Sequence, residues 1–381
     1  MLVLLLAAAS LAVWLYLVLA RGFFWLGRER DTAAVALPAV PPPVAIVVPA
    51  RNEAENIAAS VTSLLKQDYP ALSLIVVDDD SQDGTAEIAR RTAASLGVES
   101  KLSIVESHTL PPEWTGKLWA VKQGIQAAEE QLAPTYLMLT DADIVHTPDT
   151  LSWLVARAER GKLALTSLTA RWRCENIPER VHIPAFIYFF QMLYPFAWVN
   201  RPDHPEAGAA GGCMLVRAEA LRAAGGIEAI RDALIDDCAL AAALKRQGPI
   251  WVGLTDRSRS IRPYASWADM RRMIARSAYA QLQYSPLLLA GTILGMVLTY
   301  LVPPFMALFA SGWGQFLGAL TWALMAISFQ PILRFYRLSP LWGVALPAIS
   351  FLFMLYTLDS AYQYAAGKGG AWKGRVQAKA S

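Results

Sequence analysis

Long apolar runs occur near both ends of the chain, and shorter apolar runs separated by polar residues fill the middle. The first run, Leu2–Ala20, has 19 residues and no charge, so as a helix it would span about 28 Å, close to the thickness of a bilayer core. Three further runs have spanning length: Pro286–Ala310, Trp313–Leu333 and Leu341–Leu358. We therefore expect a transmembrane anchor over residues 1–20 and three transmembrane helices within residues 286–364.

Basic residues indicate the orientation of these helices. Arg21, Arg28 and Arg30 follow the first run, whereas a cleaved signal peptide carries its basic residues before its apolar core. A retained anchor whose C-terminal side faces the cytosol fits this order, because positive charge favours the cytosolic side. The same rule places the loop with Arg334 and Arg337 in the cytosol.

The basic tail, residues 365–381, does not obey this rule. Counting crossings from the anchor would leave its basic residues on the opposite side: Lys368, Lys373, Arg375 and Lys379. Either the last apolar run re-enters the membrane without crossing it, or the tail is an exception to the rule. The sequence leaves both interpretations open.

Between the apolar ends, strand-like and helix-like patterns alternate. Apolar runs predict buried strands at 44–48, 72–77, 102–105 and 136–140, and helical spacing predicts helices at 56–65, 85–96 and from 116. This alternation is typical of an α/β fold with a doubly wound, mostly parallel sheet. No G-x-G-x-x-G follows the first strand, which disfavours a dinucleotide-binding dehydrogenase. We expect the domain to cover residues 44–255, after a linker at 21–43 that contains an extended Ala/Pro-rich stretch.

Two other segments are partly apolar but do not suit a membrane span. Val181–Asn200 contains Pro184 and Pro195, and a span there would put Asp143 and Asp237 on opposite sides of the membrane. We interpret it as a helix at the membrane interface, with a buried core helix as the alternative. Segment 256–285 interleaves arginines with apolar residues, a pattern typical of an amphipathic membrane surface.

Composition narrows the class of protein. Of 381 residues, 55% are hydrophobic and 17% charged, against about 25% charged in an average soluble domain. The net charge of +3 is too small to indicate nucleic-acid binding, and we expect none. The three cysteines show no metal-binding spacing and suit small buried residues in a reducing compartment.

Two acidic pairs are candidates for chemistry. Asp141 and Asp143 directly follow the strand at 136–140, and ligands of α/β sheets bind where strands end. Two such carboxylates raise each other's pKa unless a cation lies between them, so they indicate a Mg²⁺ or Mn²⁺ site; a surface turn is the alternative. Asp236 and Asp237 begin a predicted helix, where the helix dipole favours acids in any case.

Six short motifs follow one another along the chain: Val48–Glu53, Val77–Thr85, Gly116-Lys117, Asp141-Ala142-Asp143, Gly225-Gly226 and Asp236-Asp237. In this order they resemble the motifs of the family 2 glycosyltransferases, and the resemblance covers residues 44–254. The resemblance implies the GT-A fold and transfer of a sugar from a nucleotide-sugar donor. Leu110–Lys117 and the membrane segments are similar to the hopanoid-biosynthesis-associated branch. That similarity implies a bacterial inner-membrane enzyme that acts near polyprenoid lipids.

The resemblance also implies roles for the motif residues. Asp79, or Asp78 as its alternative, would accept a hydrogen bond from the donor base, and Lys117 would lie near the base or the pyrophosphate. Asp143 with Asp141 would carry the metal and the ribose or diphosphate contacts. The expected donor-binding residues are Ala50, Glu53, Asp78, Asp79, Lys117 and Asp141.

Asp237 matches the catalytic acid of the family, which would act as the base that deprotonates the acceptor. Asp236 stands where the family carries Glu, so an acceptor contact from that position is in question. The Gln-x-x-Arg-Trp sequence of processive synthases is missing, since Met273–Ser277 keeps only Arg276. A non-processive enzyme is therefore expected.

Together these features predict a membrane-bound, inverting glycosyltransferase that moves one sugar to a lipid acceptor, polyprenoid or hopanoid, at the cytosolic leaflet. The alternative is a non-catalytic membrane scaffold that binds nucleotide sugars. A transporter is disfavoured because the C-terminal apolar runs hold almost no ionisable residues at mid-depth.

Overall fold

The computed structural model describes residues 1–33 and 36–370, which divide into two compact units. The sheet unit comprises Glu29–Arg173 and Trp198–Pro263, and the helical unit comprises Met1–Arg28, Cys174–Ala197 and the chain from Tyr264. Residues 34 and 35 of the expected linker lie outside the described residues. So does most of the expected basic tail, with Lys373, Arg375 and Lys379.

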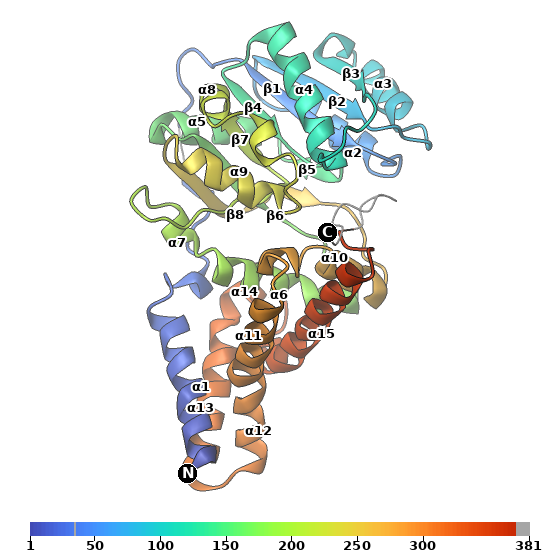
Figure 1. Ribbon diagram of the computed structural model, residues 1–381. Helices are drawn as coiled ribbons and strands as arrows, with labels where there is room; N and C mark the ends of the chain where they lie inside the picture. Colours follow the sequence, from blue (N-terminus) through green and yellow to red (C-terminus); the bar gives the residue numbers. More distant parts are fainter. Residues whose placement is uncertain (34–35, 371–381) are drawn as a thin grey trace. The chain divides into compact units, whose positions relative to one another are not determined.

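The sheet unit is built on eight strands in the order β3-β2-β1-β4-β7-β6-β8-β5 (Figure 1). Neighbouring strands from β3 to β4 are parallel, β7 is antiparallel to both of its neighbours, β6 and β8 are parallel, and β5 is antiparallel to β8. The strands are β1 Val44–Ala50, β2 Leu72–Asp78, β3 Leu102–Glu106, β4 Tyr136–Leu139, β5 Ile144–His146, β6 Leu165–Arg171, β7 Met214–Arg217 and β8 Ile250–Ser260. The mostly parallel sheet expected from the sequence is confirmed.

The register of the parallel strands brings several loops to one edge of the sheet. All seven residues of β1 are buried, as expected for a strand covered on both faces. Its last residue, Ala50, is aligned with Asp78, the last residue of β2. The chain therefore leaves β1 and β2 side by side, and the next residues of both strands meet at that edge.

Helix α4 packs closely on this part of the sheet. Thr115 caps its first turn by accepting a hydrogen bond from the Leu118 amide. At Gly124, an added Cβ would come within 2.4 Å of Val47 Cγ1 and 2.8 Å of Val77 Cγ2. The missing side chain therefore lets α4 approach β1 and β2. The helices of this unit are α2 Ile57–Leu65, α3 Thr85–Ser95, α4 Gly116–Leu132, α5 Thr150–Gly161, α8 Ala218–Ala223 and α9 Asp236–Lys245.

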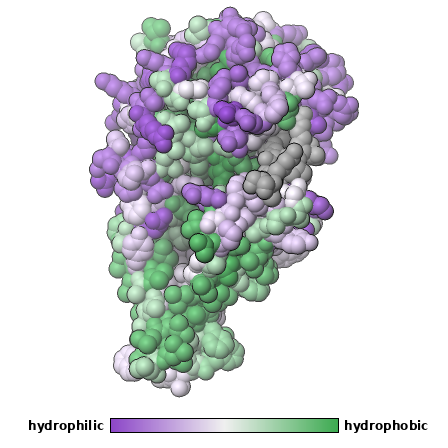
Figure 2. Space-filling view, in the orientation of Figure 1, coloured by the Kyte–Doolittle hydropathy of each residue, from purple (hydrophilic) through white to green (hydrophobic). Residues whose placement is uncertain are grey.

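Among the described residues, the helical unit contains four helices that are long and apolar enough to cross a membrane: Leu2–Leu19, Pro286–Phe309, Gly312–Phe335 and Pro340–Ala365. Figure 2 shows hydrophobic side chains over the surface of these helices. They coincide with the anchor and the three C-terminal runs predicted from the sequence. Their component helices are α1 Leu2–Leu19, α11 Pro286–Met296, α12 Val302–Phe309, α13 Gly312–Ser328, α14 Gln330–Phe335 and α15 Leu346–Ala365.

The remaining helices are α6 Ile177–Leu193, α7 Phe196–Val199 and α10 Trp267–Ala275. Helix α6 is largely buried within the helical unit, where the Tyr188 hydroxyl lies 2.7 Å from Ser328 Oγ. This burial agrees with the alternative of a core helix. Helix α10 is amphipathic, because Met270 and Ile274 are buried whereas Arg271 and Arg272 are exposed.

Candidate active site

The loops after β1 and β2 are tied together by hydrogen bonds. The Asp79 amide donates to Ala50 O at 2.8 Å, and the Glu53 amide donates to Thr85 Oγ1 at 2.9 Å. The carboxylates of Asp79 and Glu53 are almost fully buried, and Arg51 Nη1 lies 3.7 Å from Asp79 Oδ2. Ala50, Glu53 and Asp79, which are expected to hold the nucleoside, therefore lie together at one edge of the sheet.

Asp78 is placed differently from its neighbour. One of its carboxylate oxygens accepts a hydrogen bond from the Ser81 amide at 3.2 Å, so the side chain closes the turn after β2. Of the two candidates for the base contact, the structure thus gives Asp78 a turn-forming role and leaves Asp79 deeper in the fold.

Lys117 links two of the acidic motifs. Its Nζ lies 3.0 Å from Asp141 Oδ1, beyond the end of β4, and 3.1 Å from Asp236 Oδ2, at the start of α9. Burial alone would lower the pKa of Lys117, but the carboxylates of Asp141 and Asp236 outweigh it and raise that pKa. Lys117 therefore stays positively charged and draws together segments that are distant in the sequence.

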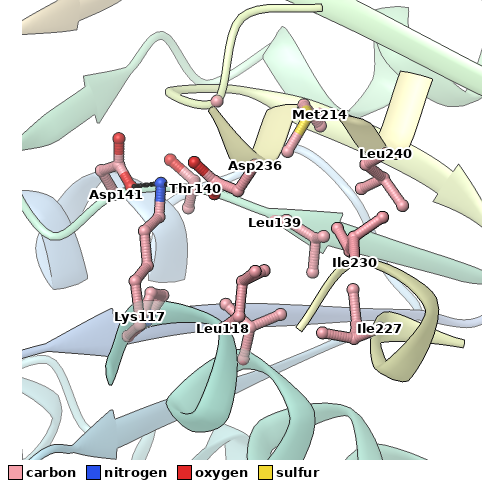
Figure 3. A pocket seen from close by; sticks show the side chains of 13 residues that line it. Lys117, Leu118, Leu139, Thr140, Asp141, Met214, Ile227, Ile230, Asp236 and Leu240 are labelled. Carbon is pink, nitrogen blue, oxygen red and sulfur yellow. Dashed lines mark ion pairs between the residues drawn. The ribbon is translucent and has the colours of Figure 1, made fainter. Parts of the chain in front are cut away.

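Figure 3 shows the pocket around this cation. Lys117, Asp141 and Asp236 form its polar end, and apolar side chains line the rest. Burial, with the charges of Asp143 and Asp236, raises the pKa of Asp141, while Lys117 opposes the shift. The apolar lining residues include Leu118, Leu139, Met214, Ile227, Ile230 and Leu240.

Asp237 is held by backbone amides in the first turn of α9. Its Oδ2 accepts from Gly211 N at 2.9 Å and its Oδ1 from Cys238 N at 2.8 Å. Burial and the charge of Asp236 raise its pKa to about 6, and Lys117 and the two amides oppose this rise. Asp237 is thus a fixed carboxylate whose pKa suits proton transfer near neutral pH.

Gly211 brings these groups within reach of one another. A Cβ at this position would lie 3.4 Å from Lys117 Nζ and 3.5 Å from Asp237 Oδ2. Gly211, which lies in the small-residue stretch Gly208–Gly212, therefore allows a close approach of the backbone to the Asp237 carboxylate.

Asp143 pairs with a residue that the sequence did not single out. Arg262 Nε donates to Asp143 Oδ2 at 2.7 Å, and Ser260 Oγ lies 3.4 Å from the same oxygen. Arg262 also pairs with Glu53 through Nη2. The guanidinium therefore connects the loop after β1 with the Asp-x-Asp turn.

His146 is a structural residue within the described chain. Its Nε2 lies 3.0 Å from Thr140 Oγ1 and its Nδ1 lies 2.9 Å from Ser258 Oγ. Burial lowers its pKa to about 3, so the ring is neutral. Both nitrogens are taken by side chains of the sheet unit, which fixes the strand end before Asp141 and leaves no nitrogen for a metal.

The sequence model of the family described as glycosyl transferase family 2 matches residues 45–225. That range contains the loops after β1 and β2, Lys117, and both residues of the Asp-x-Asp turn. This domain belongs to glycosyl transferase family 2.

Comparison with solved structures bears on the fold. The chain resembles the mannosyltransferase PcManGT from Pyrobaculum calidifontis, solved in complex with GDP-Man and Mn²⁺, with a TM-score of 0.56. The sequences are 21% identical, and the likeness covers 95% of this chain and 98% of that one. The sheet unit therefore has the predicted GT-A fold, accompanied by apolar helices at the N-terminus and in the C-terminal region.

Curated relatives match shorter parts of the chain. Glycosyltransferase AglE of Haloferax volcanii is 46% identical over 52 residues, which are 13% of this chain and 17% of that protein. The 4,4'-diaponeurosporenoate glycosyltransferase of Staphylococcus haemolyticus is 33% identical over 101 residues, 26% of this chain and 24% of that protein. The chain thus spans less than a quarter of the length of either relative.

The acidic residues of the family 2 domain suit a divalent cation. Asp141 and Asp143 are one residue apart, and each already faces a cationic side chain. In residues 1–33 and 36–370, no three His, Cys, Asp or Glu side chains gather as a metal-binding group. The protein would therefore supply one or two carboxylates, with phosphate and water oxygens as the other ligands, an arrangement common for Mg²⁺.

Sequence reasoning missed Arg262 because its surroundings resemble a membrane-surface segment. The expected amphipathic segment began at 256, but β8 continues to Ser260, and Arg262 follows it directly. The alternation of serine and arginine at 257–260 is a strand signal, with Ser258 and Ser260 buried.

Proposed function

We propose that this protein is a membrane-bound, inverting glycosyltransferase that moves one sugar from a nucleotide-sugar donor to a lipid acceptor. The observation that carries the proposal is the convergence of Lys117, Asp141, Asp236 and Asp237 beside Gly211. Family 2 membership of the domain supports the reaction class, and four apolar helices support a lipid environment for the acceptor.

In the proposed reaction, an acceptor hydroxyl attacks the anomeric carbon while its proton passes to Asp237. The bond from that carbon to the diphosphate breaks on the opposite face, so the configuration is inverted. Asp237 suits this role because its two backbone hydrogen bonds fix its orientation and its raised pKa favours proton uptake. Asp236 is held by Lys117 and helps to raise that pKa.

The donor would be held by the loops at the sheet edge. Ala50, Glu53 and Asp79 would contact the nucleoside, and Lys117 would offset charge on the diphosphate. Asp143 and Asp141 would hold Mg²⁺ or Mn²⁺, which when bound stabilises negative charge on the leaving diphosphate. The complex of PcManGT with GDP-Man and Mn²⁺ supports this choice of donor class and metal.

We further propose residues 1–20 as the anchor, 44–263 as the catalytic domain, which includes all of β8 and Arg262, 264–285 as the interface segment and 286–364 as the transmembrane helices. The catalytic domain would face the cytosol at a bacterial inner membrane, where arginines after the first helix favour that orientation. A polyprenoid or hopanoid acceptor fits this location. Transfer of one sugar fits the missing processivity motif.

Substitution of the proposed base tests the function. Asp237→Asn keeps the size of the side chain but removes its basicity, so sugar transfer should fall about 10²–10⁴-fold. The assay is mass spectrometry of lipids from cells that express the wild-type or the variant chain, followed by transfer assays with the purified protein and Mn²⁺.

Asp203→Asn serves as the control, because Asp203 is exposed and pairs with Arg201 only two residues away. Circular dichroism should show the same helix content in all three proteins. Full transfer activity in a folded Asp237→Asn variant would refute the assignment of the base. Donor binding without any turnover in the wild type would point to the scaffold instead.

A further inference from the structure

Arg262 lies between the two parts of the proposed donor site. Its Nε is 2.7 Å from Asp143 Oδ2 and its Nη2 is 2.5 Å from Glu53 Oε1. The side chains of Asp143 and Glu53 are only 12% and 7% exposed, so water compensates little of their charge. The Arg262 guanidinium pairs with both carboxylates.

The site as a whole carries more carboxylates than cations. Lys117 balances part of the charge on one side, and Arg262 balances it on the other. Burial alone would lower the pKa of Arg262, but its carboxylate partners outweigh burial and raise it, so Arg262 remains charged. The carboxylates concerned are Glu53, Asp141, Asp143, Asp236 and Asp237.

A buried carboxylate that loses its cationic partner is strongly destabilised. A divalent cation held by Asp143 would compensate the charge of the same carboxylate that Arg262 contacts. Two cations beside one carboxylate would also repel each other. In the nucleotide-free protein, Arg262 should therefore lower the affinity of Asp143 for the metal ion.

We propose that Arg262 is a built-in counter-cation that competes with the divalent metal for Asp143 until a nucleoside diphosphate enters the site. The diphosphate adds negative charge that accommodates both cations, so the metal binds weakly alone and tightly with the donor. This proposal rests on the proposed function, because it takes Asp143 as a metal ligand and the site as a donor site.

The test is a titration of the purified full chain with Mn²⁺ alone, in which free Mn²⁺ is counted by electron paramagnetic resonance. Arg262→Gln should bind Mn²⁺ at least tenfold more tightly than the wild type, and Arg262→Lys should lie between them. Arg259→Gln is the matched control: Arg259 is an exposed arginine whose Nε contacts Asp256 O, and its loss should leave Mn²⁺ affinity unchanged. Asp143→Asn should abolish the difference between the Arg262 variant and the wild type.

Addition of GDP or UDP should then raise Mn²⁺ affinity more in the wild type than in Arg262→Gln. If Arg262→Gln does not fold, the double variant Glu53→Gln, Arg262→Gln removes one charge of each sign and should show the same tighter Mn²⁺ binding. Equal or weaker Mn²⁺ binding in the folded variants would overturn the proposal, as would the absence of Mn²⁺ binding in every protein. Because this readout needs no sugar transfer, such a failure stays distinguishable from a failure of the Asp237→Asn test.

Discussion

At the scale of single residues, the raised pKa of Asp237 predicts how activity depends on pH. Burial and the neighbouring Asp236 raise that pKa to about 6. The proposed base must be ionised, so the rate should be constant well above pH 6 and fall about tenfold for each pH unit below it. In Asp236→Asn, which removes one cause of the shift, the midpoint should move to lower pH. Both profiles can be measured as kcat against pH with saturating donor, and an acidic limb that stays in place in Asp236→Asn would contradict this cause.

The same scale shows what the sequence could not provide. Asp141, Asp143 and Asp237 could be proposed as site residues from the sequence, because their motifs are local and occur in a familiar order. Arg262 could not be proposed in this way, because its partner Glu53 lies 209 residues away. The basic residues around it also have the composition of a membrane-surface segment, so composition does not distinguish that role from a donor site. The role of His146 was missed for a similar reason, because its partner Ser258 lies 112 residues away.

At the scale of elements, the close packing of α4 on the sheet predicts the effect of one methyl group. A Cβ on Gly124 would lie 2.4 Å from Val47 Cγ1, so Gly124→Ala should force α4 away from β1 and lower the free energy of unfolding by about 1–3 kcal/mol. Lys117 is carried by the same helix, so sugar transfer should fall as well.

Gln126→Ala, on the exposed side of α4, is the control and should change the free energy of unfolding by about 0.5 kcal/mol or less. Thermal unfolding followed by circular dichroism compares them, and an unchanged Gly124→Ala protein would show that α4 adjusts without cost.

Strands differ in how well the sequence predicts them. The parallel strands β1, β2, β3 and β4 were predicted to within two residues, because strands covered on both faces are continuous apolar runs. Strands β5 and β7 have three and four residues, too few for a periodic signal. Strand β8 mixes apolar residues with arginines and serines, and its partners β5 and β6 are distant in the sequence. Its extent follows from those pairings rather than from its own pattern.

At the scale of the whole molecule, four apolar helices predict a topology that can be tested. If the catalytic domain lies in the cytosol, the connection at Ser311 must lie outside and the connection at Ser339 inside, because the helices Pro286–Phe309 and Gly312–Phe335 each cross once. The arginines at 334 and 337 favour the same arrangement. Cysteine substitutions in a chain whose three native cysteines are replaced by serine or alanine report these positions.

In intact cells, a membrane-impermeant maleimide should label Ser311→Cys and leave Ser339→Cys unlabelled until the cells are opened. We propose that the last helix, Pro340–Ala365, crosses completely, because its 26 residues exceed the length needed to span a bilayer core. Lys368→Cys should then be labelled from outside, against the preference of basic residues for the cytosol. If Lys368→Cys is labelled only after lysis, this helix re-enters the membrane without crossing it. If Ser339→Cys is labelled in intact cells, the proposed orientation is reversed, and the sugar chemistry takes place at the other leaflet.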